Sequence, residues 1–353
     1  MSDARLHAAR LCLEGFPGWG AGEVGGSGTG EGVNYMGKRM RLLVAYDGSD
    51  CADAALADLK RAGLPREVEA LVFTVGDVFL PPVSSYEVVA RALSSRRVTT
   101  AIAQSQAQSA RALEAARAVA DGGCELLRSA FPRWEVRAEV AAGTPARAII
   151  ERAEHWDADL VAVGARGRSA LGRLLLGSVS KKVATEARNS VRVTRCLEGK
   201  VIVDAPIRLL VGFDGSTAAR AAVRAVARRA WPAGSTARVV AVAEYPPATP
   251  IGGLMPAAAS VITVSAGEGL RELQEGVEAA GEDLAAVAGL HVSCEVRRGD
   301  PKRVLAEEAE KMQADCIFVG SRGRGGPIER FLLGSVSAAL VNNAPCSVEV
   351  ARA

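Results

Sequence analysis

A glycine-rich loop is the part of this sequence best suited to chemistry. Gly164 and Gly167 are followed, nine residues later, by the pair Gly177-Ser178. The loop begins where an apolar strand expected at residues 160–163 ends, and it closes at the predicted start of a helix. Glycines at such a point let backbone N–H groups approach phosphate oxygens without a Cβ in the way, and a helix N-terminus attracts anions. The spacing therefore predicts a phosphate-binding loop, to which the Ser178 hydroxyl contributes.

A carboxylate stands at a second strand end. Asp47 follows an apolar run and precedes Gly48-Ser49. In an open parallel sheet, neighbouring first and fourth strands place such residues together at their carboxyl ends. The carboxylate and the glycine loop would then hold opposite ends of a nucleotide. Two alternatives stay open here: Asp47 caps the following helix, and the glycine loop is a structural turn.

Both features occur twice. The segment RLLVAYDGS at 41–49 returns as RLLVGFDGS at 208–216, and ADLVAVGARGR at 158–168 returns as ADCIFVGSRGR at 314–324. A shared L-L-G-S-V-S segment and a shared G-x-P segment complete four landmarks in one order. This self-similarity indicates a tandem duplication. We expect domains at residues 39–197 and 206–353, preceded by a glycine-rich extension at 1–38 that is disordered.

Each copy alternates short apolar runs with helical patterns, which indicates a parallel sheet covered by helices. We therefore expect an α/β fold with two doubly wound domains of five strands each. The third helix of each copy should begin at a capping residue, Thr144 or Asp300, followed by proline. In the first copy the expected strands are residues 42–46, 69–75, 134–140, 160–163 and 191–196, and the expected helices are 52–61, 86–129, 144–155 and 178–188.

Composition narrows the classes of partner. The 353 residues carry a net charge of +3 with both signs interspersed, which does not favour nucleic acid or an anionic membrane. Seven cysteines form no C-x-x-C pair and there are three histidines, so no zinc site is expected. No apolar run has the length of a membrane span, and we expect a cytoplasmic protein. The G-x-x-x-x-G-K-[ST] loop of P-loop NTPases is absent from the sequence, and no catalytic residue is identified.

The order of motifs resembles the universal stress protein family. It consists of D-G-S after strand one, G-x-P before helix three, and G-x-x-G-x9-G-S-V-S after strand four. The resemblance covers about residues 40–197 and 206–353 and implies the strand order 3-2-1-4-5 in each domain. It also implies ATP binding, with adenosine held by the strand-one Asp and the end of strand two, and phosphates held by the glycine loop. The residues carried over are Ala45, Asp47, Val75, Gly164, Gly167, Gly177, Ser178, Val179 and Ser180 in the first copy, and Gly212, Asp214, Ala243, Gly320, Gly323, Gly334, Ser335, Val336 and Ser337 in the second.

The function implied is that of an adenine nucleotide-binding regulator of stress responses, whose partner contacts depend on the nucleotide. Mg²⁺ would arrive with ATP, because no carboxylate cage is visible. The alternatives are a slow ATPase or phosphotransfer enzyme and a nucleotide-free dimerising scaffold.

Two expectations concern the relation between the copies. The apolar runs at 191–196 and 347–351 are edge strands of the kind that pair in this family, which predicts an intramolecular pseudo-dimer and leaves a homo-oligomer open. Gly323 and Gly334 enclose ten residues instead of nine, which predicts the weaker site in the second copy.

Overall fold

The computed structural model describes residues 39–76, 96–167, 176–195, 205–244, 256–323 and 333–353. The extension at 1–38, expected to be disordered, lies outside the described residues, as does the start of the helix expected at 86–129. Among the described residues, none of the helices combines the length and the hydropathy that a membrane span requires.

The first copy alternates strands and helices as the sequence patterns predict. Its strands are β1 (Met40–Ala45), β2 (Val68–Gly76), β3 (Glu135–Ala142), β4 (Leu160–Gly164) and β5 (Ser190–Thr194). Its helices are α2 (Asp50–Asp58), the 3-10 turn η1 (Leu59–Arg61), α4 (Arg96–Ala130), α5 (Pro145–His155) and α6 (Ser178–Glu186).

The second copy repeats this series. Its strands are β6 (Arg208–Phe213), β7 (Ser235–Ala243), β8 (Leu290–Arg298), β9 (Cys316–Gly320) and β10 (Ser347–Ala351). Its helices are α7 (Thr217–Ala227), α8 (Pro256–Ala285), α9 (Pro301–Lys311) and α10 (Ser335–Asn343).

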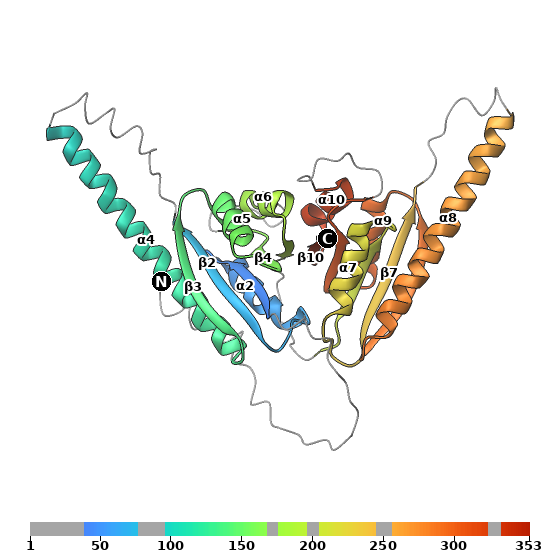
Figure 1. The fold of residues 1–353 in the computed structure, drawn as a ribbon, viewed down its shortest axis with the longest axis horizontal. Helices are drawn as coiled ribbons and strands as arrows, with labels where there is room; N and C mark the ends of the chain where they lie inside the picture. The colour runs from blue at the N-terminus through green and yellow to red at the C-terminus, as the bar shows by residue number, and fades with distance from the viewer. Residues whose placement is uncertain (1–38, 77–95, 168–175, 196–204, 245–255, 324–332) are drawn as a thin grey trace, which may run out of the picture.

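All ten strands form one sheet, in the order β3-β2-β1-β4-β5-β10-β9-β6-β7-β8 (Figure 1). Within each copy the strands are parallel in the predicted order 3-2-1-4-5, whereas β5 and β10 pair antiparallel. The predicted pairing of the fifth strands is therefore confirmed. Because β1 lies between β2 and β4, and β6 between β7 and β9, each copy has a switch point at the carboxyl end of its first strand.

The core has three parts. One apolar cluster runs across both copies under α5, α6, α9 and α10, and includes Ile149, Val183, Leu305 and Leu340. The opposite face of the sheet carries a separate cluster in each copy, covered by α2 and α4 in the first and by α7 and α8 in the second. The long helices α4 and α8 lie on the outer flanks (Figure 1). The sheet is therefore buried on both faces, as parallel strands require.

The predicted caps of the third helices differ in the two copies. Asp300 accepts a hydrogen bond from the backbone N–H of Lys302 and caps α9 as expected. Thr144 stands at the N-cap position of α5, but its side chain makes no capping hydrogen bond. The expected role of Thr144 as a side-chain cap is wrong, and the start of α5 depends on Pro145, whose missing N–H needs no partner there.

Candidate functional site

The turn after the first strand is tied to the glycine loop. In the second copy, Asp214 Oδ1 accepts a hydrogen bond from the Ser216 N–H (3.0 Å). Ser216 caps α7 by accepting from the N–H of Ala219, and it donates its hydroxyl to the carbonyl of Arg322 in the loop (3.1 Å). Two strand ends are thereby joined at the switch point.

The first copy has the same arrangement. Ser49 caps α2, Asp47 Oδ1 accepts from the Ser49 N–H (3.0 Å), and the Ser49 hydroxyl donates to Arg166 O (3.5 Å). The interpretation that Asp47 itself caps the helix is therefore wrong.

The second oxygen of each carboxylate faces a loop glycine. A Cβ placed on Gly167 would lie 2.7 Å from Asp47 Oδ2, and one placed on Gly323 would lie 2.6 Å from Asp214 Oδ2. A side chain at either position would displace the carboxylate. The structure thus brings together the aspartate and the second glycine in both copies, as predicted.

Gly164 and Gly320 have a different role. A Cβ on Gly164 would lie 2.5 Å from Cys51 O, and one on Gly320 would lie 2.5 Å from the carbonyl carbon of Ala218. Both neighbours are backbone atoms of the helix that follows the first strand. These two glycines therefore let that helix pack on the strand end, whether or not they also approach a ligand.

Both loops close in the same way. The Gly177 N–H donates to Ala165 O and the Gly334 N–H donates to Ser321 O, each at 2.7 Å. The loop interiors, with the additional residue of the second copy, lie outside the described residues. The described ends are alike, so the predicted weakness of the second site stays a prediction.

The predicted serines in the first turns of α6 and α10 are of two kinds. Ser180 and Ser337 are buried and donate to Ala165 O (2.8 Å) and Gly320 O (2.6 Å), so their hydroxyls brace the loop. The serines that open the helices are exposed, and the valines after them are half-buried. Since each N-cap is a glycine without a side-chain oxygen, no capping side chain reaches the first-turn amides. The four residues concerned are Ser178, Val179, Ser335 and Val336.

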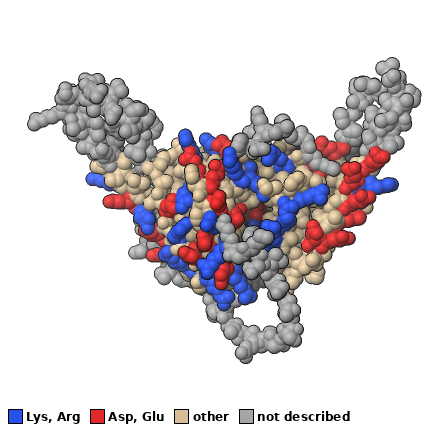
Figure 2. All heavy atoms as spheres, in the orientation of Figure 1, with Lys and Arg blue, Asp and Glu red and all other residues tan. Residues whose placement is uncertain are grey.

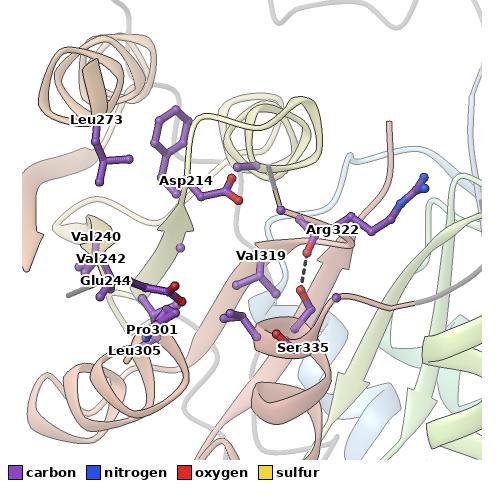
Figure 3. Close-up of a pocket in the computed structure, with 18 residues that line it drawn as sticks. Asp214, Val240, Val242, Glu244, Leu273, Pro301, Leu305, Val319, Arg322 and Ser335 are labelled. Atoms are coloured by element: carbon purple, nitrogen blue, oxygen red, sulfur yellow. Dashed lines mark hydrogen bonds between the residues drawn. The ribbon is translucent and has the colours of Figure 1, made fainter. Parts of the chain in front are cut away.

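A cavity of about 550 Å³ opens at this point in the second copy (Figure 3). One side carries Asp214, the loop glycines and the start of α10, and the remaining walls are mostly apolar. The apolar walls consist of Val240, Val242, Leu273, Leu305 and Val319. The second-copy residues predicted from the sequence that line it are Gly212, Asp214, Gly320, Gly323, Gly334, Ser335, Val336 and Ser337.

Ala243 is not among the lining residues. Gly76 and Ala243 hold the same position, since their carbonyls accept from the glycine that precedes the third helix in each copy. The counterpart of Val75 is therefore Val242, which lines the cavity. Successive strand residues face opposite sides of a sheet, so Ala243 packs in the cluster on the other face. The prediction was displaced by one residue.

Sequence reasoning also missed wall residues that come from other elements. Val240 and Val242 could have been found from strand alternation, and Pro301 and Leu305 from helical i,i+4 spacing. Glu244, directly after β7, adds a second carboxylate, and Leu273 of α8 has no sequence signal. In the first copy, Ala45 is paired with Phe73, as Gly212 is paired with Val240 in the second. Phe73 therefore stands at the position of Val240, and Ala45 stands at that of Gly212.

The charges around the site do not form a metal cage. Among the described residues there is no group of three or more His, Cys, Asp or Glu side chains that could hold a metal ion. The guanidinium of Arg322 extends away from the cavity (Figure 3). Figure 2 shows acidic and basic side chains intermingled on the visible face of the molecule.

Comparison with known proteins places both copies in one family. A model of the universal stress protein family matches residues 38–195 and 207–352. A universal stress protein of Mycolicibacterium smegmatis is 30% identical over 229 residues, covering 62% of this chain and 69% of the relative. One of Mycobacterium tuberculosis is 33% identical over 235 residues, covering 62% and 70%. The crystal structure of a universal stress protein from Archaeoglobus fulgidus shares the fold, with a TM-score of 0.53, 23% identity and coverage of 88% of this chain and 98% of that one.

Proposed function

The chain belongs to the universal stress protein family, and from this premise we propose that it binds ATP and acts as a stress-response regulator whose partner contacts depend on the nucleotide. The observation that carries the proposal is the cavity in the second copy. It has the Asp214 carboxylate and a glycine loop at one end and apolar side chains along its walls.

The shape of this cavity suits an adenine nucleotide. Its volume of about 550 Å³ is in the range of small-molecule sites, which combine apolar walls with a few fixed polar groups. Adenosine would lie between Val242, Leu273 and Leu305, with Asp214 accepting from the ribose hydroxyls. The phosphates would meet the first-turn amides at Ser335 and Val336, which no side chain caps.

The first copy is proposed to bind in the same way through Asp47 and its own loop. The joined strand ends support this, since Asp47, Ser49 and Arg166 repeat the contacts of Asp214, Ser216 and Arg322. Mg²⁺ is proposed to be bound by the phosphates, with the protein contributing at most Asp214 and Glu244 from the cavity wall.

We propose a binding role in preference to turnover. A hydrolase would need a group that activates water, and Asp214 Oδ1 is already engaged by the Ser216 N–H. The nucleotide is then a signal that changes what the protein contacts. The proposed setting is the cytoplasm, where ATP is at hand.

The test is isothermal titration of ATP with Mg²⁺ into protein shown to be empty by denaturation and mass spectrometry. We expect binding with a dissociation constant between micromolar and sub-millimolar. Gly334→Val and Gly177→Val should each remove one site and leave the fold intact, because the added Cβ would crowd the loop backbone, 3.3 Å from Arg322 Cα and 3.2 Å from Ala165 O, and shift the amides that would meet the phosphates. Absence of heat in the empty protein would show the proposal to be wrong, and steady release of phosphate well above the spontaneous rate would favour the ATPase alternative.

The two sites can be ranked by titrating Asp47→Ala and Asp214→Ala separately. The longer second loop predicts tighter binding in the Asp214→Ala variant, which keeps the first site. Tighter binding in the Asp47→Ala variant would reverse that ranking.

A further inference from the structure

Arg192 and Glu349 face one another at the centre of the seam between the copies. In the antiparallel pairing of β5 and β10, Arg192 is matched with Glu349. Both hold the same position in their own copies, since Arg192 is matched with Ala162 and Glu349 with Phe318, each two residues before the first loop glycine. The local two-fold axis that relates the copies therefore passes between a positive and a negative side chain.

These charges are fully buried and joined in a row. Arg192 is 1% exposed and Glu349 0%. Arg192 Nη1 lies 3.2 Å from Glu349 Oε2, and Arg192 Nε lies 2.6 Å from Asp58 Oδ2. Arg229 forms an ion pair with the other oxygen of Glu349. The row Asp58–Arg192–Glu349–Arg229 thus alternates in sign.

The outer members of the row have no charged counterparts. Asp58 lies nine residues after the cap Ser49, and the residue nine after Ser216 is Ala225. In the same way, the position of Arg229 in the second copy is occupied by Ala62 in the first. Each copy therefore carries its own neutralising partner, acidic in the first and basic in the second.

Some other contacts across the seam use residue types that both copies share. Arg195 donates to Val341 O of the second copy (2.8 Å), and Arg352, at the equivalent position, donates to Ala184 O of the first (2.6 Å). The ion pair Arg61–Asp315 (3.1 Å) joins residues whose counterparts, Arg228 and Asp159, are also Arg and Asp. Such contacts would form equally well between two identical copies.

We infer that the charges at the centre of the seam restrict the fifth-strand edge to pairing of the first copy with the second. Two first copies would place Arg192 against Arg192, and two second copies would place Glu349 against Glu349, in a site closed to water. Like charges directly opposite destabilise a sheet, and in such a pair each buried charge would keep only the partner from its own copy, Asp58 or Arg229. The partner that fits each edge is the complementary domain, and a second copy of the same domain is rejected. This selectivity is independent of nucleotide binding.

The experiment uses full-length protein with a protease site introduced between β5 and β6, cut after folding. The two halves are unfolded in urea, refolded together by dilution and weighed by native mass spectrometry. We expect pairs of one half with the other and no pairs of like halves. In a variant with Asp58→Asn, Arg192→Gln, Glu349→Gln and Arg229→Gln, which removes all four charges of the row, all three pairs should appear. The matched control is Arg61→Gln with Asp315→Asn, which weakens the seam without altering its selectivity and should give mixed pairs alone.

Like pairs in the wild-type protein, or mixed pairs alone in the variant without the four charges, would overturn the inference. If the separated halves fail to refold, hydrogen exchange in the uncut chain tests the same inference. In the uncut chain, Glu349→Arg should speed hydrogen exchange of β5 and β10 amides and leave β1 and β6 protected. Unchanged exchange at β5 and β10, or equal loss in all four strands, would count against a selective role at the seam.

Discussion

The glycines of the two loops differ in what an added methyl group would touch. At Gly320 the contact would be with the backbone of α7 near Ala218, which cannot yield. At Gly323 it would be with the carboxylate of Asp214, the end of a short side chain on the cavity wall. Substitutions three residues apart therefore separate stability from ligand binding.

We expect Gly323→Ala to weaken ATP binding at the second site and to leave the fold stable. The methyl group displaces the Asp214 carboxylate, and losing one hydrogen bond to a charged group costs about 1.5–3 kcal/mol, or roughly tenfold to hundredfold in affinity. Titration in an Asp47→Ala background measures the second site by itself. Gly269→Ala is the control, since nothing lies within 4 Å of its added Cβ. Equal affinities in the two variants would contradict the role given to Asp214.

Two buried thiols should make stability fall above pH 9. Burial raises the pKa of Cys316 from 9.0 to about 12 and also raises the pKa of Cys346. Below pH 9 these thiols are protonated whether the chain is folded or unfolded, so they contribute nothing. Above pH 9 only the unfolded chain releases the protons, so each thiol lowers the free energy of unfolding with a slope approaching about 1.4 kcal/mol per pH unit.

Urea unfolding between pH 7 and pH 10 measures that slope. Cys316→Ala with Cys346→Ala should make it less steep, and a smaller slope should remain because burial also raises the pKa values of Cys124 and Cys294. The range ends at pH 10 because burial lowers the pKa of Arg352 to about 10. Its earlier deprotonation in the folded state would act in the opposite sense at higher pH. An equally steep slope in the double variant would show that the thiols are not responsible.

At the scale of elements, the motifs were enough to predict the position of the loop, and the family resemblance that they carry implied the strand order. The prediction failed where the position along a strand had to be known to within one residue. Ala243 was chosen as the end of β7, yet alternation along the strand turns Val242, and not Ala243, toward the cavity. Leu273 was out of reach because helix α8 lies in the region where the copies differ most in length, and its contact with the cavity depends on how that helix crosses the sheet.

The short helices α6 and α10 each begin at a glycine loop and end under an arginine from the other copy. Arg352 donates to Ala184 O in the last turn of α6, where a positive charge also complements the helix dipole. We expect Arg352→Ala to lower the free energy of unfolding by about 1–3 kcal/mol, because the carbonyl loses its charged donor. Arg147→Ala, which breaks an exposed i,i+4 pair with Glu151, should cost much less. Urea unfolding measures the loss of unfolding free energy in both variants. Equal losses would show that the contact of Arg352 with the other copy adds no stability.

For the whole molecule, the sequence predicted that the fifth strands pair, but not what lies at their centre. The apolar character of β5 and β10 was visible, so an edge-to-edge contact was a reasonable expectation. Arg192 stands in the middle of such a strand and is buried only because Glu349 and Asp58 meet it there. Those partners come from another copy and another element, and no local pattern connects them.

The continuous sheet and the shared apolar cluster predict that both copies unfold together. Val191, Val193, Val348 and Val350 join the two halves of that cluster across the seam. Scanning calorimetry of the wild-type chain should therefore give one transition. Arg192→Ala leaves Glu349 buried with one ion-pair partner fewer. Breaking a buried ion pair costs about 3–5 kcal/mol, and this loss weakens the contact between the copies.

With that contact weakened, we expect the calorimetric transition to split into two, one for each copy. The splitting follows because the Arg192–Glu349 pair crosses the seam, whereas the pair with Asp58, which is also lost, lies inside the first copy and lowers the stability of that copy alone. Arg152→Ala is the control, since it breaks a bidentate pair with Glu139 (2.6 and 2.8 Å) inside the first copy and not at the seam. It should lower Tm without resolving a second transition. A single, merely shifted transition in Arg192→Ala would mean that the apolar contacts of the seam hold the copies together without the charges.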